Sequence, residues 1–221
     1  MAPRKRQRTQ KKQACEQDYR LSLVDMPVEI LTQVGSYVLP IDLLSLSRTN
    51  KSLRGLLMDR TSRHVWQSAM QNMEGLPPCP SKWSEPRYLS LIFSKTCSIC
   101  GKPTRSRVDE VLLVRLCGGC RDKRLMPLGE LPDFLYSLVH HSTRITRRES
   151  QVLREDAEAV YNRYNQLREY GDGILFLGWV DHRKRRTNNR RKNSLELIKF
   201  LDALEQEQIL ERDDLKAARR A

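Results

Sequence analysis

Four of the six cysteines in this chain are spaced as metal ligands. They occur as two Cys-x2-Cys pairs, "CSIC" and "CGGC", with sixteen residues between the pairs: Cys97, Cys100, Cys117 and Cys120. Two thiolates two residues apart can bind one Zn²⁺ from a tight turn, and a second pair completes a tetrahedron. Because protein ligands then fill all four positions, the spacing predicts one structural zinc ion and no catalytic metal. Four ligands are too few for a RING domain, and the alternative interpretation is four unligated buried thiols.

The other side chains that could ligate a metal or take part in catalysis have no partners close in sequence. Cys15 and Cys79 are interpreted as free thiols without a role, and the adjacent His140 and His141 as surface or partly packed side chains that diverge. The sequence contains no recognisable nucleophile–base arrangement, Gly-rich phosphate loop or paired carboxylates. We therefore expect a protein that is not an enzyme.

The positive charge is unevenly placed along the chain. The formal net charge is +13, whereas residues 21–74 contain five basic and five acidic residues. The excess lies in residues 1–20, around the four cysteines and in "HRKRRTNNRRK" at 182–192. Such basic runs suit nuclear localisation signals, non-specific binding of nucleic acid, or a solvated surface. A nucleic-acid-binding zinc protein is therefore an alternative function.

The expected location is the nucleus, the cytoplasm or both. No apolar run approaches the ~20 residues that span a bilayer, and the basic N-terminus lacks a following apolar region of signal-peptide length. In these reducing compartments, cysteines favour metal binding or free thiols over structural disulfides.

The apolar spacing and the helix breakers predict a mostly α fold. Four short helices are expected in residues 21–74: one from Met26 to Val38, one starting at Pro40, one capped by Asn50, and one at 64–70. Within the first, the small Gly35 could allow close packing.

The rest of the chain is expected to form a small module around the cysteines, followed by helices. The β-branched run at 109–116 predicts a strand of a short β-hairpin in a zinc-ribbon-like module. Helices are expected at roughly 131–141, 147–170, 172–182 and 194–219, the last capped by Ser194. The predicted organisation is a basic disordered arm, a short-helix bundle, a linker, a zinc module and a helical C-terminal region: 1–20, 21–74, 75–96, 97–124 and 125–221.

The segment from Met26 to Trp66 resembles an F-box. The resemblance rests on four ordered features: Met26-Pro27-Val28-Glu29-Ile30-Leu31, then Val34 with Tyr37-Val38, then Pro40-Ile41-Asp42-Leu43-Leu44, and finally Trp66. One departure is Met26, where the family usually has Leu, a change that conserves volume. The order of box and cysteine module also resembles a group of fungal F-box proteins, in architecture only.

The resemblance implies a partner for this neutral segment. F-box bundles dock on the Skp-type adaptor of SCF-type cullin-RING ubiquitin ligases, and the chain after the box presents a protein substrate, here unknown. Short helices this rich in apolar residues cannot all be hidden from water, which agrees with a docking surface; the alternative is a private helical core. Trp66 is expected to anchor the box internally. Carried over by position, the adaptor contacts would be Pro27, Ile30, Leu31, Pro40, Leu43 and Leu44.

Overall fold

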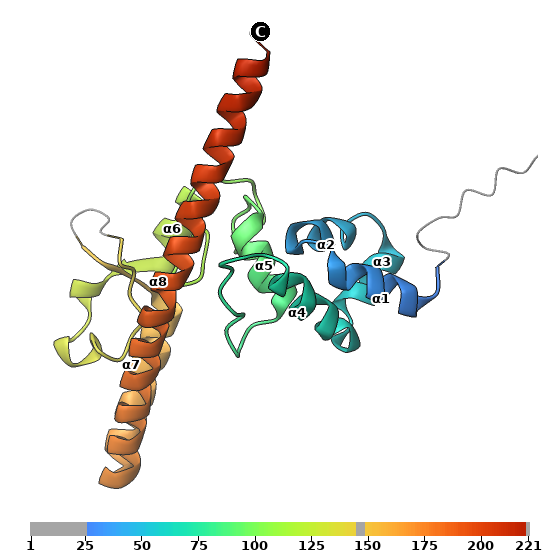
Figure 1. The fold of residues 1–221 in the computed structure, drawn as a ribbon. Coiled ribbons are helices and arrows are strands. Elements are labelled where there is room, and N and C mark those ends of the chain that lie inside the picture. The colour runs from blue at the N-terminus through green and yellow to red at the C-terminus, as the bar shows by residue number, and fades with distance from the viewer. Residues whose placement is uncertain (1–25, 145–148, 220–221) are drawn as a thin grey trace, which may run out of the picture.

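The computed structural model describes residues 26–144 and 149–219, and it is mostly helical (Figure 1). The basic arm predicted at 1–20 lies outside the described residues. None of the helices in the two described segments combines the length and apolarity that crossing a bilayer requires.

The four short helices predicted at the start of the chain are confirmed. Pro40 begins the second helix, where its missing N–H group costs no hydrogen bond. Asn50 caps the third, its side-chain oxygen accepting a hydrogen bond from the Leu53 N–H at 2.8 Å. The helices are α1 (Val28–Tyr37), α2 (Pro40–Leu46), α3 (Lys51–Met58) and α4 (Arg63–Gln71), with a 3₁₀ turn, η2 (Arg60–Ser62), before α4.

Two residues hold this bundle together as the sequence predicts. Gly35 is buried where α1 meets α4, and a Cβ atom there would lie only 2.8 Å from Val65 Cγ1. Trp66 is 1% exposed, and its indole Nε1–H donates a hydrogen bond to the Leu57 carbonyl at 2.6 Å. The ring therefore ties α4 to the end of α3 from inside.

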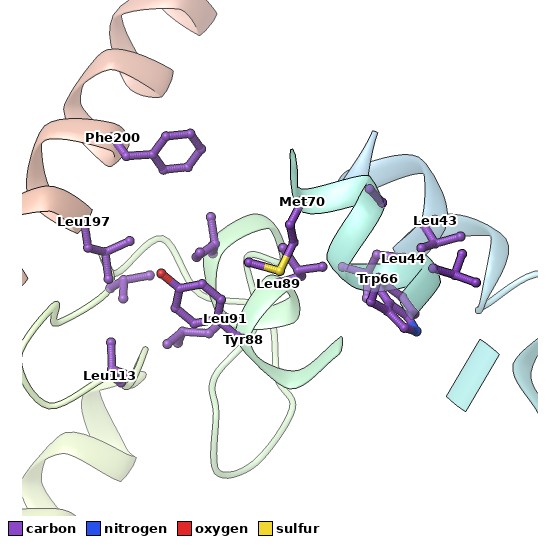
Figure 2. Close-up of a cluster of buried hydrophobic side chains, with 14 of the residues drawn as sticks. Leu43, Leu44, Trp66, Met70, Tyr88, Leu89, Leu91, Leu113, Leu197 and Phe200 are labelled. Carbon is purple, nitrogen blue, oxygen red and sulfur yellow. The ribbon is translucent and has the colours of Figure 1, made fainter. Parts of the chain in front are cut away.

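The segment predicted as a linker at 75–96 forms a helix in its second half, α5 (Glu85–Phe93). Tyr88 and Leu89 of α5 are nearly fully buried and belong to the same apolar cluster as Leu43 and Trp66 of the bundle. Figure 2 shows Tyr88 and Leu89 between Leu43 and Trp66 of the bundle on one side and Leu197 of the last helix on the other. The apolar core thus continues from the bundle into the rest of the chain.

The strand predicted at 109–116 is wrong. These residues form a tight turn closed by a single bridge between Asp109 and Val114, and Leu113 has a positive φ of 52°. Asp109 Oδ1 accepts hydrogen bonds from two backbone N–H groups in the turn. The run is apolar because Val111, Leu112 and Leu113 are buried, which does not require a strand.

Two short strands occur instead further along the chain, after the cysteines. Strand β1 (Leu125–Pro127) pairs antiparallel with β2 (Gln151–Leu153), so that Met126 lies opposite Val152. The helix predicted at 131–141 is wrong, since the described segment contains only the 3₁₀ turns η3 (Leu128–Glu130) and η4 (Asp133–Leu135). Each turn follows a proline, whose missing N–H and fixed φ suit a turn.

The C-terminal helices differ from the prediction in their limits. Helix α7 (Arg154–Tyr170) begins after β2, later than expected, and ends at Gly171, whose φ is 79°. The helices predicted at 172–182 and 194–219 are one, α8 (Gly173–Ala218), 46 residues long. Ser194 is therefore no cap: it is buried in mid-helix, and its hydroxyl donates to the Arg191 carbonyl.

Helix α8 packs against two apolar clusters. Leu197 and Phe200 reach the bundle cluster, whereas Trp179 and Val180 pack on a second cluster built around Leu138 and Val152. Its C-terminal end extends beyond the rest of the chain (Figure 1). Helix α8 thus packs against both apolar clusters and connects them.

Candidate metal centre and docking face

The four predicted ligands converge. The sulfur atoms of Cys97, Cys100, Cys117 and Cys120 all lie within 4.8 Å of one another, and the Cys100 and Cys117 sulfurs are 3.7 Å apart. Tetrahedral zinc with ~2.3 Å metal–sulfur bonds requires sulfur–sulfur edges of about 3.8 Å. The cluster therefore has the chemistry and the dimensions to hold one metal ion.

Each Cys-x2-Cys pair is shaped by its own local turn. In the first, the Gly101 N–H donates to the Cys97 carbonyl at 3.0 Å, and Gly101 adopts φ 69°, which favours glycine. The second pair lies at the start of the short helix α6 (Gly118–Arg124), where the Cys120 N–H donates to the Cys117 carbonyl at 3.1 Å. Backbone N–H groups of Ile99, Cys100 and Cys117 thereby lie near the Cys97 sulfur.

The electrostatics of the cluster favour a bound cation. Burial acts to raise the pKa of the Cys97 thiol, but hydrogen bonds from backbone N–H groups, among them that of Cys100, lower the pKa to about 6. Hydrogen bonding to the Cys117 sulfur, together with burial, raises the pKa of Cys120 to about 12. The Cys97 thiolate thus forms readily, whereas a Cys120 thiolate needs a positive charge close to it.

Arg115 connects the cysteine module to the core. Its backbone exchanges hydrogen bonds with Ser98 in the first cysteine turn, at 2.7 and 2.9 Å. Its guanidinium donates to the carbonyls of Ser106, Leu91 and Ile92, the last two in α5. The sequence interpretation counted Arg115 among basic residues around the cysteines that could meet nucleic acid. It is instead 9% exposed, and its position inside the apolar run "VLLVRL" was the available signal.

The six predicted adaptor contacts divide into two groups. Pro27 and Ile30 are exposed and Leu31 is partly buried. Pro40, Leu43 and Leu44 are buried, with Leu43 only 1% exposed, so these three pack the inside of the bundle and cannot meet a partner in this structure. Their interpretation as surface contacts is corrected accordingly.

An exposed apolar face does exist on the bundle, and it is centred on α1. Ile30, Val34 and Tyr37 follow one another at i, i+4 and i+7, which puts them on one side of the helix, while Leu31 and Gly35 lie on the packed side. We call this set, with its neighbours before and after, the α1 face. Its exposed members are Val28, Ile30, Val34, Tyr37, Leu39 and Ile41, with exposures from 41% to 75%. The two apolar stripes of this helix were the sequence signal for it.

The other singled-out residues take no part in the metal cluster. His140 and His141 are partly buried and lie apart from the cysteines, as expected. Cys79 is a free thiol whose pKa burial raises to about 11, while Cys15 lies outside the described residues.

The basic run at 182–192 lies entirely within α8. Arg183 is buried, its Nε donating to the Leu138 carbonyl at 2.6 Å and its Nη2 to the Asp156 carboxylate at 2.9 Å. Arg185 pairs with Asp181 one turn earlier. Part of the run therefore has a structural role, while Lys184, Arg186 and Lys192 are exposed.

Comparisons with protein-family models, with curated proteins and with solved structures each find no match to this chain.

Proposed function

We propose that this chain is a non-catalytic substrate receptor of an SCF-type ubiquitin ligase, with residues 26–74 docking on a Skp-type adaptor and through it on the cullin and RING subunits. The observation that supports the proposal is the α1 face. It is a set of exposed apolar side chains, centred on α1, on a bundle whose formal charges balance and whose core is already filled.

The α1 face is large enough to contribute binding free energy. Full burial of one such side chain stabilises by ~1.5–3 kcal/mol, and side chains that are half exposed retain about half of that for a partner. Tyr37, at 75% exposure, retains the largest share. Such aromatic side chains are frequent at the centre of protein interfaces.

We also propose that the cysteine cluster holds one structural Zn²⁺. The site has four protein thiolates and so leaves no coordination position for a substrate. Its role would be to fix the turn at 97–103 and α6 against the turn at 109–116, whose Arg115 is bound to α5. The segment after the bundle would thereby present a rigid surface.

Co-purification with the adaptor tests the docking proposal. An Ile30→Asp/Tyr37→Asp variant should lose the complex, because two charges would be buried at the interface, while its circular dichroism stays unchanged. A Leu210→Asp/Leu215→Asp variant is the matched control, since both leucines are exposed near the end of α8. An unchanged complex with the α1 variant, or equal loss with the control, would rule out docking through this face. Leu43 and Leu44 are unsuitable because charging them would unfold the bundle.

The alternative, a nucleic-acid-binding zinc protein, is supported by the exposed basic residues of α8 but not by Arg115 or Arg183, which are buried. Titration with duplex and single-stranded oligonucleotides at increasing salt tests it. Phosphate contacts would give a steep loss of affinity with salt, and absence of binding at low salt would exclude this function.

A further inference from the structure

A second surface lies beside the bundle and is strongly basic. A cleft of about 900 Å³ is formed by the ends of α2 and α3, the turn η2 and the start of α4 on one side, and by residues 81–90 on the other. Six basic side chains and two carboxylates line it: Arg48, Arg54, Arg60, Arg63, Lys82 and Arg87, with Asp59 and Glu85.

The two carboxylates are engaged within the chain. Glu85 is 4% exposed and accepts hydrogen bonds from Arg63 Nε at 2.7 Å and Gln67 Nε2 at 3.2 Å. Asp59 accepts from both the backbone N–H and the hydroxyl of Thr61. The basic side chains other than Arg63 form no salt bridge with any described carboxylate. The cleft thus keeps an excess of uncompensated positive charge.

Two of these cations are held in place by neutral partners. Arg48 Nη2 donates to the hydroxyls of Ser94 at 2.8 Å and Ser90 at 3.1 Å. The Arg87 guanidinium lies over the Trp83 ring, 4.3 Å from its centroid. Such contacts orient a guanidinium without neutralising it, which lowers the entropy lost when an anion binds.

The cleft also offers apolar surface next to the charges. Met58, Trp83 and Pro86 line it, and Met58 is 38% exposed. Cations beside an apolar wall suit a peptide that carries both acidic and apolar side chains. A nucleic acid fits less well, because Trp83 is the cleft's one partly exposed aromatic ring for stacking and the Arg87 guanidinium already lies over it.

We infer that this cleft binds an acidic segment of a protein partner, recognising carboxylate or phosphate groups on a peptide chain. Naming that partner as the substrate to be ubiquitinated rests on the proposed function. The binding does not, because Ile30, Val34 and Tyr37 of the α1 face are not among the cleft residues.

Fluorescence anisotropy with labelled peptides tests the inference on the full-length chain. The probes are a ten-residue Asp/Glu-rich peptide containing one Leu, its Asn/Gln counterpart, and a serine peptide with and without phosphorylation. The acidic probe should bind, and its affinity should fall as the salt concentration rises. The Asn/Gln probe should bind at least about tenfold more weakly. Comparing the two acidic types separates carboxylate from phosphate recognition. Tryptophan emission should change on binding, and Trp83→Phe should remove that change.

Matched charge reversals give the decisive comparison. The Arg48→Glu/Arg87→Glu variant should bind the acidic probe about tenfold or more weakly. The Lys184→Glu/Arg186→Glu variant on α8 has the same change in net charge, and its affinity for the probe should stay within about twofold of the unmodified protein. Equal loss in both variants, equal binding of acidic and neutral probes, or tighter binding of a single-stranded oligonucleotide at the cleft would overturn the inference.

The cleft and the α1 face can fail separately. If Arg48→Glu/Arg87→Glu still binds the adaptor but the unmodified protein does not bind acidic peptide, only the cleft inference fails. If acidic peptide binds the cleft but the adaptor is not bound, the peptide site stands and the ligase function fails.

Discussion

Gly35, Arg115 and His140 are single residues whose surroundings determine their roles. Because Gly35 has no side chain, α1 and α4 can pack so closely that a Cβ atom at this position would overlap Val65. Arg115 satisfies three backbone carbonyls in a buried setting, and burial lowers its pKa although the side chain still donates as a guanidinium. His140 lies among charged side chains of α7 and α8. Each environment leads to a distinct measurable effect.

Replacing Gly35 with alanine should destabilise the bundle. In a helix, alanine is favoured over glycine by ~1 kcal/mol, but the new methyl group would overlap Val65 Cγ1 at 2.8 Å, and overpacking costs ~1–3 kcal/mol. We expect a net loss of about 1 kcal/mol in urea unfolding followed by circular dichroism.

Gly55→Ala in α3 is the matched control for this prediction. No atom lies within 4 Å of a Cβ there, so alanine should stabilise by ~0.5–1 kcal/mol. If both variants shift stability in the same direction, the close approach of α1 and α4 does not limit packing.

The pH dependence of stability should include a contribution from His140. Burial lowers its pKa to about 4, helped by Arg183 and Arg190 and opposed by Asp156, against an ordinary value of 6.5. Between these two values the unfolded chain binds more protons than the folded one, so stability falls as the pH drops from 6.5 towards 4. His140→Gln should reduce that slope, removing of order 1–3 kcal/mol of pH dependence in denaturant titrations. An unaltered slope in the His140 variant would refute the assignment.

At the scale of elements, α8 does most to organise the chain. Its N-terminal end packs on the second apolar cluster through Trp179, and its middle packs on the bundle cluster through Leu197 and Phe200. The segment between these contacts contains no proline or glycine, and its basic residues are good helix formers, so the helix continues through it. The charged run is thus helical throughout, with Arg183 buried and Lys184 and Arg186 exposed, and it connects the two apolar clusters.

Truncation of Leu197 tests whether α8 is an integral part of the bundle core. Leu197 is 2% exposed, and Leu197→Ala should cost ~2–4 kcal/mol in global unfolding. Leu210→Ala, on the same helix at 65% exposure, should change stability by less than about 0.5 kcal/mol. If the two variants had similar stabilities, α8 would not contribute to the core.

At the scale of the whole molecule, the cysteine module and the bundle share one core. Val108 and Leu113 from the module belong to the same cluster as Trp66 of the bundle and Tyr88 of α5. Arg115 adds hydrogen bonds between the module and α5. Loss of a metal ion at the cysteines should therefore destabilise the bundle as well as the cysteine module.

Removal of the metal should lower the stability of the whole chain. Metal analysis should find one zinc ion per chain, and a strong chelator should reduce the free energy of unfolding by several kcal/mol, because the module cannot keep its turns. Circular dichroism, which reports on all helices, and fluorescence of the buried Trp66 should show the same loss.

Cysteine substitutions serve as controls for the metal prediction. Cys100→Ser should lose the zinc and mimic chelation, whereas Cys79→Ser, outside the cluster, should retain it. A metal-free protein with unchanged stability, or chelation that spares the Trp66 signal, would contradict the shared core.

Local signals in the sequence were sufficient for several features. Pro40 and Asn50 predict helix starts because their effects act within one turn, and the spacing of Cys97, Cys100, Cys117 and Cys120 predicts convergence because metal coordination dictates it. Apolar runs were less informative. The run at 109–116 is buried in a turn rather than a strand, and the stretch 131–141, expected to be a helix, contains only the short 3₁₀ turn η4.

By itself, then, the sequence determined the mostly helical class, the four short helices and the convergence of the four cysteines, since these follow from residue types and spacing along the chain. Only the tertiary structure decided which apolar residues are exposed and which are buried. Leu43 and Leu44 are buried while Ile30 and Val34 are exposed, although all four are apolar aliphatic residues. It also decided that Arg115 and Arg183 belong to the core, and that Arg48 and Arg87 face one cleft. Burial and charge pairing depend on which distant segments meet, and that is set by packing in three dimensions.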